Sequence, residues 1–151
     1  MDRQTMIVMC GLPRSGKSTY VDRHFPNYQI ACPDDIRLGL GTEFNPYIED
    51  YVWSVNNTII RAHLMRRYNV VVDATNTTIG SIEKYKRMAD EEYYRFLIIL
   101  MRTTKEECLR RNVGPGSVPV EVIERMDRQL NEMIDSEFLK KYEVKYDHEY
   151  S

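Results

Sequence analysis

The stretch GLPRSGKST at residues 11–19 limits the fold of this chain more than any other feature. It follows the apolar run MIVMC, and it has the spacing Gly, four residues, Gly, Lys, Ser. This is the pattern of a glycine-rich loop that joins a buried strand to the N-terminus of a helix. The stretch therefore predicts that the chain begins with a strand, a loop and a helix.

The rest of the chain has the same alternation of short apolar runs and longer helix-periodic stretches. We expect buried strands at residues 6–10, 28–32, 69–74 and 95–101, and a last strand at 142–148. We expect helices that begin at Gly16, at Asn45 as N-cap, near residue 79, at Thr104 and near Pro119. This alternation predicts an α/β fold, with a parallel sheet and helices on both faces. Ligands of such sheets gather at the carboxyl ends of the strands.

Composition agrees with one globular domain over residues 1–151. The net charge of −2 excludes a uniformly basic molecule, although it leaves room for a local basic groove that could bind nucleic acid. No apolar run approaches the ~18 residues of a membrane span, and the start MDRQTMIVMCG lacks the features of a signal peptide. We therefore expect a cytoplasmic protein with no membrane partner, whose three cysteines are buried thiols.

The glycine-rich loop predicts a nucleotide site. Gly11 and Gly16 allow turns that aim successive backbone N–H groups at one anion, and the following helix adds its positive end. Lys17 can reach the β- and γ-phosphates of ATP, and the Ser18 hydroxyl can ligate Mg²⁺. The candidate nucleotide-binding residues are Gly11, Arg14, Ser15, Gly16, Lys17, Ser18 and Thr19. The alternative is a strand–helix turn that binds no ligand.

An acidic stretch, PDDIR, follows the second expected strand. A kinase needs a carboxylate near the attacking hydroxyl and gains from a cation that holds an acceptor phosphate. Asp34 and Arg37 are three residues apart, so one helical turn brings them to the same side. The structural alternative is that Asp34 caps a short helix and Arg37 is solvated.

The third expected strand ends in VVVDATNTT, which places Asp73 at the same edge of the sheet. An acid there can hold a Mg²⁺-bound water or contact the acceptor. The alternative is a helix cap or a turn, and we expect Asn76 and Thr77 to cap the next helix in either case.

Residues 110–118 have the composition of a lid. Arg110 and Arg111 end one helix, Gly114 and Gly116 interrupt the chain, and a new helix starts near Pro119. Arginines beside a glycine-hinged loop suit a lid that closes over a transferring phosphoryl group, and Arg111 is the preferred catalytic candidate. The alternative is a basic helix C-terminus followed by an inert turn.

Four stretches together resemble the P-loop kinases related to phage-type polynucleotide 5′-hydroxyl kinase. They are GLPRSGKST, PDDIR, DATN and LRRN followed by GSVPVEVIERM, and they span residues 6 to about 130. The resemblance implies a P-loop NTPase-type sheet with a small helical lid, and ATP and Mg²⁺ as cofactors.

The resemblance also implies roles for individual residues. Asp34 is then the general base for a 5′-hydroxyl, and Arg37 holds the adjacent 3′-phosphate. Asp73 lies near the metal or the acceptor, and Arg111 lies near the transferred phosphoryl group. The lid departs from the family pattern, because it reads NVGPGS and lacks the further arginine that the family commonly carries after the asparagine.

Three functions are compatible with these residues. The first is transfer of the ATP γ-phosphate to the 5′-hydroxyl of a polynucleotide. The second is a kinase for a small hydroxyl acceptor such as a nucleoside, a sugar or an antibiotic. The third is an ATP-binding regulatory module with little transfer activity. Tyr47, Tyr51 and Trp53 could stack on bases of an extended acceptor, although such aromatic residues more often belong to a core.

Overall fold

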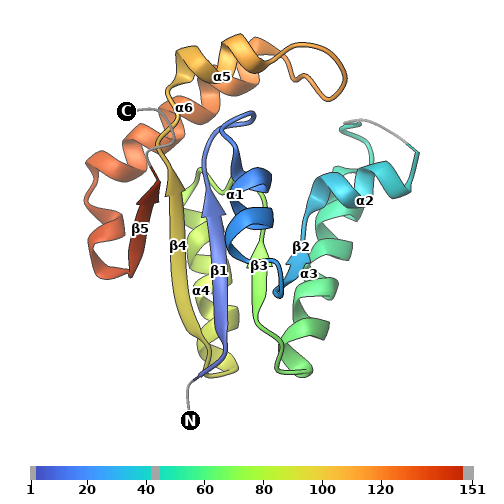
Figure 1. The fold of residues 1–151 in the computed structure, drawn as a ribbon, viewed down its shortest axis with the longest axis vertical. Helices are drawn as coiled ribbons and strands as arrows, with labels where there is room; N and C mark the ends of the chain where they lie inside the picture. Colours follow the sequence, from blue (N-terminus) through green and yellow to red (C-terminus); the bar gives the residue numbers. More distant parts are fainter. Residues whose placement is uncertain (1–2, 42–44, 148–151) are drawn as a thin grey trace.

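Parallel strands form the centre of the fold, in the order β2-β3-β1-β4-β5 (Figure 1). The computed structural model describes residues 3–41 and 45–147. Within these residues the strands are β1 (Thr5–Cys10), β2 (Gln29–Ala31), β3 (Val70–Val72), β4 (Arg95–Met101) and β5 (Val144–Asp147). All of the expected strands are present, while His148, the last residue of the final expected strand, lies outside the described residues. The expectation that residues 28–32 form a buried strand is wrong in part, because Gln29 and Ile30 of β2 are exposed and only Ala31 is buried.

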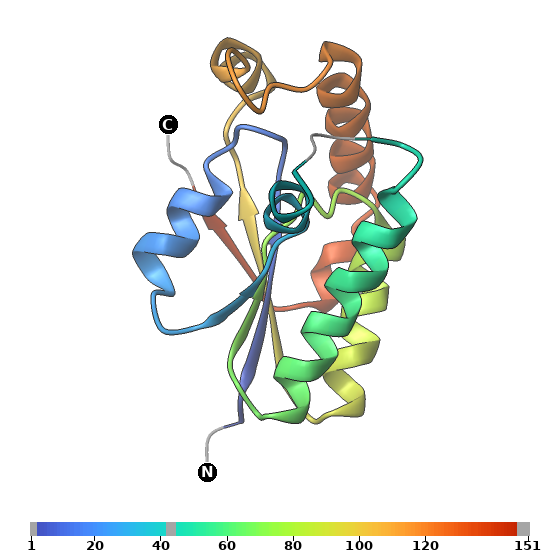
Figure 2. The ribbon, with the colours of Figure 1, turned by 90° about the vertical axis from the view of Figure 1, so that its right-hand side faces the viewer.

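Helices cover both faces of the sheet, as predicted. They are α1 (Lys17–His24), α2 (Pro33–Gly39), α3 (Glu49–Met65), α4 (Ile79–Glu91), α5 (Lys105–Arg111) and α6 (Val120–Asp135), followed by the 3₁₀ helix η1 (Phe138–Lys141). Figure 2 shows α1 on one face of the sheet and α3, α4 and α6 on the other. None of the described helices is long and apolar enough to cross a membrane.

The central strands are buried on both faces, which explains why they read as continuous apolar runs rather than alternating ones. Met6 and Val8 of β1 pack into the larger core beneath α3, α4 and α6. Ile7 and Met9 point the opposite way, into a smaller core beneath α1. Of the expected buried thiols, Cys10 and Cys108 are buried and Cys32 is half-buried.

The start of α3 differs from the prediction. The helix begins at Glu49 with Ile48 in the N-cap position, so the expected N-cap at Asn45 is wrong. The Asn45 side chain instead accepts a hydrogen bond from the backbone N–H of Tyr47, at 3.0 Å between Oδ1 and N. Asparagine favours such local turns as readily as helix caps, because its side chain bonds the backbone two residues on.

The buried face of α3 also differs from the prediction in its register. The apolar spacing of Ile48, Val52, Val55 and Ile59 in the sequence predicts one buried face. Of these, Val55 and Ile59 are only half-buried. The fully buried positions are Val52, Asn56, Ile60 and Leu64. Apolar periodicity could not identify this face, because one of its four members is an asparagine.

Candidate active site

The glycine-rich loop lies between β1 and α1, at the carboxyl edge of the sheet (Figure 1). A Cβ on Gly11 would lie 2.9 Å from Ser15 Oγ and 3.0 Å from Met101 Cβ, so the loop can pass the end of β4 only without a side chain there. Gly16 has φ 94°, in the left-handed region that favours glycine, and it precedes the first turn of α1. Both glycines of the motif are therefore required by the backbone.

The Lys17 side chain bonds back to the start of this loop. Its Nζ donates to the carbonyl oxygens of Leu12 at 2.6 Å and Gly11 at 3.1 Å. Burial lowers the pKa of Lys17, and the nearby carboxylate of Asp73 opposes that shift. A positive charge held by main-chain oxygens inside the loop is placed to receive the phosphates of a nucleotide.

Ser18 and Asp73 meet at the base of α1. The Ser18 hydroxyl donates to Asp73 Oδ2 at 2.9 Å, and the Asp73 side chain is buried at the end of β3. Burial raises the pKa of Asp73, while the hydrogen bond from Ser18 and the charge of Lys17 lower it. A hydroxyl and a carboxylate oxygen at this spacing are hard oxygen ligands of the kind that Mg²⁺ prefers, so the two residues fit the metal that the motif implies.

Asn76, expected as a helix cap, has a different position. The N-cap of α4 is Thr78, whose side chain accepts from Ser81 N at 3.3 Å. Asn76 is buried, with φ 46°, and its Nδ2 donates to the carbonyl of Met9 at 2.7 Å. Thr77 does not cap the helix either, because its hydroxyl donates to Gln129 of α6. Asn76 thus joins the end of β3 to β1 directly before the phosphate loop.

Asp34 and Arg37 lie together on α2, as their spacing predicts. Nη1 of Arg37 is 2.6 Å from Oδ1 of Asp34. The alternative in which Asp34 caps this helix is wrong, because the N-cap is Cys32 and Asp34 lies within the first turn. The Asp34 carboxylate is exposed at 81%, and its charge raises the pKa of both Lys17 and Asp73. The charge of Asp34 is therefore close enough to the phosphate loop to affect Lys17 and Asp73.

A second carboxylate that sequence reasoning missed also holds Arg37. Glu49, the first residue of α3, accepts from Nε of Arg37 at 2.9 Å and from Nη2 at 2.5 Å. Hydrogen bonding to Glu49 is the largest contribution to the raised pKa of Arg37. Glu49 is twelve positions from Arg37, so no helical spacing could have linked the two.

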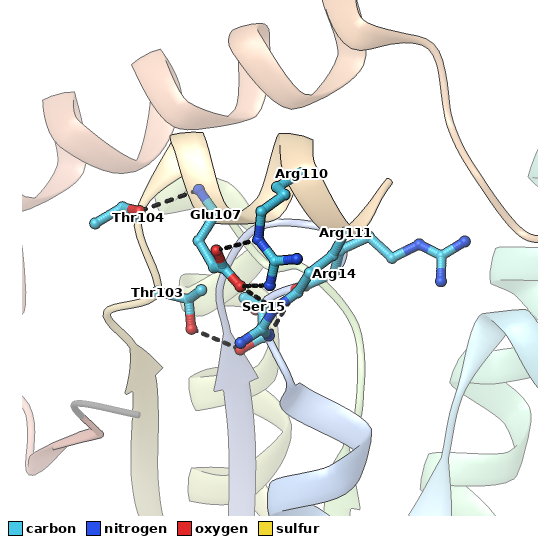
Figure 3. Close-up of polar contacts among 7 residues, drawn as sticks. All are labelled: Arg14, Ser15, Thr103, Thr104, Glu107, Arg110 and Arg111. Carbon is cyan, nitrogen blue, oxygen red and sulfur yellow. Dashed lines mark hydrogen bonds and ion pairs between the residues drawn. The ribbon is translucent and has the colours of Figure 1, made fainter. Parts of the chain in front are cut away.

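The lid segment contacts the phosphate loop directly (Figure 3). Nη1 of Arg111 donates to the backbone oxygen of Arg14 at 3.1 Å. Nη2 of Arg14 donates in return to the carbonyl of Pro115 at 2.8 Å. The Thr103 hydroxyl, after β4, donates to the carbonyl of Ser15 at 2.7 Å. These bonds join the lid segment and the chain after β4 to the backbone of the phosphate loop.

Glu107 forms hydrogen bonds with both lid arginines, Arg110 and Arg111. Its carboxylate accepts from Nε of Arg110 at 2.8 Å and from Nε of Arg111 at 3.0 Å, as Figure 3 shows. Hydrogen bonds from these two guanidinium groups lower the pKa of Glu107 to about 2. Thr104 is the N-cap of α5 as predicted, since it accepts from Glu107 N at 3.1 Å.

The aromatic residues at the start of α3 are not core residues. Tyr47 is 90% exposed and Tyr51 is 55% exposed. Trp53 is half-buried, and Nζ of Lys84 lies 5.5 Å from its ring centroid. Tyr51 lies on the helix that supplies Glu49, and Tyr47 lies in the turn directly before that helix.

A parallel sheet with a glycine-rich loop, a half-buried lysine and a serine–aspartate pair at its carboxyl edge defines a P-loop NTPase-type fold. A family model described as an AAA domain (AAA_33) matches residues 6–135. The chain belongs to this family of P-loop kinase domains. Its resemblance to the polynucleotide kinases is thereby confirmed.

One curated relative is the L-seryl-tRNA(Sec) kinase of Methanococcus maripaludis, which is 29% identical over 128 residues. The match covers 80% of this chain and 50% of the relative, so the chain spans about half the length of that protein.

Solved structures show the same fold. A chain in the Pnkp1/Rnl/Hen1 RNA repair complex superposes with a TM-score of 0.78 and 24% identity, over 90% of this chain and 47% of that one. A second structure of the Pnkp1/Rnl/Hen1 complex gives a TM-score of 0.64 and 26% identity, over 76% of this chain and 41% of that one. A chain of the PezAT toxin–antitoxin system of Streptococcus pneumoniae superposes with a TM-score of 0.72 and 18% identity. The match covers 95% of this chain and 68% of that one.

Proposed function

We propose that this chain is an ATP-dependent kinase that transfers the γ-phosphate to a hydroxyl, first among acceptors the 5′-hydroxyl of a polynucleotide. The pairing of Asp34 with Arg37 beside the phosphate loop carries this proposal. An exposed carboxylate and a cation are the two groups that an acceptor hydroxyl and its neighbouring phosphate would need. Membership of the P-loop kinase family supports ATP as the donor.

The nucleotide phosphates are assigned to the loop. Backbone N–H groups of Gly16 to Thr19, at the positive end of α1, bind the α- and β-phosphates, and Lys17 reaches the β- and γ-phosphates. Ser18 and Asp73 would hold Mg²⁺, whose charge offsets that of the phosphates when it is bound. These are the roles that the motif assigns to residues which the fold brings together.

The transfer step needs a base and positive charge. The acceptor hydroxyl oxygen attacks the γ-phosphorus, its proton passes to the Asp34 carboxylate, and the bond from the γ-phosphorus to the bridging oxygen breaks to release ADP. Arg37 has three of its five N–H donors committed to Glu49 and Asp34, so the remaining two can bind an acceptor phosphate. Arg111, on the lid, supplies positive charge near the transferred group.

A second acceptor is favoured by the curated relative. That protein is an L-seryl-tRNA(Sec) kinase, so its name describes transfer to a hydroxyl-bearing group on RNA. Two other functions fit the same residues. One is a kinase for a small hydroxyl acceptor, and the other is an ATP-binding regulatory module. The acidic pair Asp34 and Glu49 suits a hydroxyl acceptor in each of the kinase cases.

The test is transfer from γ-labelled ATP with Mg²⁺ to 5′-hydroxyl DNA, 5′-hydroxyl RNA, L-seryl-tRNA and a panel of nucleosides and sugars. Lys17→Ala and Asp34→Asn run in parallel. Asp35→Asn is the matched control, because it removes a neighbouring exposed carboxylate that forms no side-chain bond among the described residues.

Labelled oligonucleotide that disappears in Lys17→Ala and Asp34→Asn but not in Asp35→Asn supports the polynucleotide proposal. Label in L-seryl-tRNA or in a small molecule alone contradicts that acceptor and retains the kinase. ATP binding without label in any acceptor contradicts the kinase and favours the regulatory module.

A further inference from the structure

Arg14 has a backbone conformation that favours glycine. Its φ is 69°, in the left-handed region, although it carries a long side chain. It lies within the phosphate loop, between the two glycines of the motif. A bulky residue in this conformation carries a conformational cost, and such costs cluster at functional sites. We therefore expect the Arg14 side chain to form contacts that offset this cost.

The guanidinium of Arg14 lies against the lid. Its Nη2 donates to the carbonyl of Pro115 at 2.8 Å and approaches that of Val113 at 3.5 Å. A Cβ on Gly116 would lie only 3.5 Å from the same nitrogen. The loop at 112–118 reads NVGPGSV and contains no lysine or arginine. The positive charge at this part of the lid therefore comes from the phosphate loop.

Arg14 differs from the other arginines of the site in its partners. Arg37 is paired with Asp34 and Glu49, and Arg111 is paired with Glu107. Within residues 3–41 and 45–147, no carboxylate forms an ion pair with Arg14, whose acceptors are neutral carbonyls. Those two bonds use Nη2 alone, and a guanidinium has five N–H donors. Nε and Nη1 can therefore bind an anion while Nη2 stays on the lid.

We propose that the Arg14 side chain is a second phosphate-contacting arginine, which binds the γ-phosphate of ATP while it holds the lid against the phosphate loop. This proposal rests on the proposed function, because it assumes that the loop binds ATP. Hydrogen bonds from a guanidinium to phosphate oxygens are stronger than those to neutral carbonyls. Arg111 supports the arrangement, since its Nη1 holds the backbone oxygen of Arg14 at 3.1 Å.

A comparison of nucleotide affinities tests the proposal, because ADP lacks the γ-phosphate. Calorimetric titration of the full chain with Mg²⁺ uses ADP and an ATP analogue that has nitrogen between the β- and γ-phosphorus atoms. The variants are Arg14→Gln, Arg14→Lys and Arg14→Gly, the last of which also relieves the backbone strain. Arg23→Gln is the matched control, as it removes an exposed positive charge from the far end of α1.

We expect Arg14→Gln and Arg14→Gly to weaken binding of the ATP analogue by about tenfold. The affinity for ADP should stay within about twofold of the wild-type value. Arg14→Lys recovers part of the loss, because it retains a point charge. Equal losses for ADP and the analogue, or no loss for either, would overturn the proposal and leave Arg14 as a lid contact only. A wild-type chain that binds neither nucleotide overturns the proposed function itself, which separates the two failures.

Discussion

Arg37 and Glu49 face each other across α2 and α3, with Nη2 of Arg37 2.5 Å from Oε1 of Glu49 and Nε 2.9 Å from Oε2. Their side chains are only 16% and 18% exposed, unlike that of Asp34. This two-point pairing fixes the plane of the guanidinium, and Nη1 then holds Asp34. The orientation of the candidate base is thus set by a residue on another helix.

A double-mutant cycle of Arg37→Lys and Glu49→Gln measures this coupling. Because the pair is two-point and partly buried, we expect a coupling free energy of about 1–2 kcal/mol in urea unfolding. The exposed pair Lys86–Asp90 serves as the comparison and is expected to give under about 0.5 kcal/mol. Equal coupling in the two cycles would contradict the role of Glu49.

Asp73→Asn is expected to separate activity from stability. Burial raises the pKa of Asp73, so its charged form costs folding free energy once the pH rises above the ordinary carboxyl value of 3.8. Asparagine removes that cost and keeps an oxygen for Ser18, so the free energy of unfolding at neutral pH stays equal or rises. Transfer falls by at least about a hundredfold, because the candidate metal ligand is lost. A large loss of stability would identify Asp73 as a structural residue instead.

Glu107, which accepts hydrogen bonds from the two lid arginines, is expected to make stability depend on pH in the acid range. Its pKa is lowered to about 2 from 4.5, so its contribution to stability is present above pH 4.5 and is lost as the pH falls toward 2. Glu107→Gln removes this contribution. The difference in unfolding free energy between wild type and variant should therefore shrink across that range. A constant difference from pH 6 to pH 2 would show that the ion pairs with Arg110 and Arg111 do not persist in solution.

Asn76→Ala is expected to destabilise the fold by about 2–3 kcal/mol. The change leaves the buried carbonyl of Met9 without its donor and puts alanine at φ 46°. Thermal or urea unfolding measures the effect. Asn131→Ala, at an exposed position of α6, is the control and is expected to change stability by under about 0.5 kcal/mol. Similar effects of the two changes would rule out the proposed support beneath the phosphate loop.

Gly11→Ala is expected to weaken nucleotide binding by more than about tenfold. The new Cβ would meet Ser15 Oγ at 2.9 Å and Met101 Cβ at 3.0 Å, so the loop has to move away from the end of β4. In Gly39→Ala the Cβ meets no atom within 4 Å, and this helical position should gain about 0.5–1 kcal/mol of stability. Unchanged nucleotide affinity in Gly11→Ala would show that the loop tolerates the shift.

Much of the fold could be predicted because its signals are local. Each buried strand is a continuous apolar run, and Thr104 and Pro119 mark the starts of α5 and α6 as expected. The start of α3 could not be predicted in the same way. Asn45 suits both a cap and a turn, and the buried position of Asn56 contradicts simple apolar periodicity.

In the candidate site, too, the residues in local motifs could be predicted and those with distant partners could not. Lys17, Ser18 and the pair Asp34–Arg37 could be named as candidates because each belongs to a short motif. Glu49 and Thr103 were missed because their partners, Arg37 and Ser15, lie 12 and 88 positions away along the chain. No spacing rule joins such residues, since only the packing of separate elements brings them together.

The sequence by itself determined the class of this protein, because the glycine-rich loop, the buried strands and the helix caps each depend on neighbouring residues. The tertiary structure alone decided how the site is held: Glu49 on Arg37, Asn76 beneath the loop, and Arg14 and Arg111 across the lid. The physical reason is that backbone conformation and burial are set over a few residues. Ion pairs and side-chain hydrogen bonds between distant segments form only after the sheet has brought those segments to one edge.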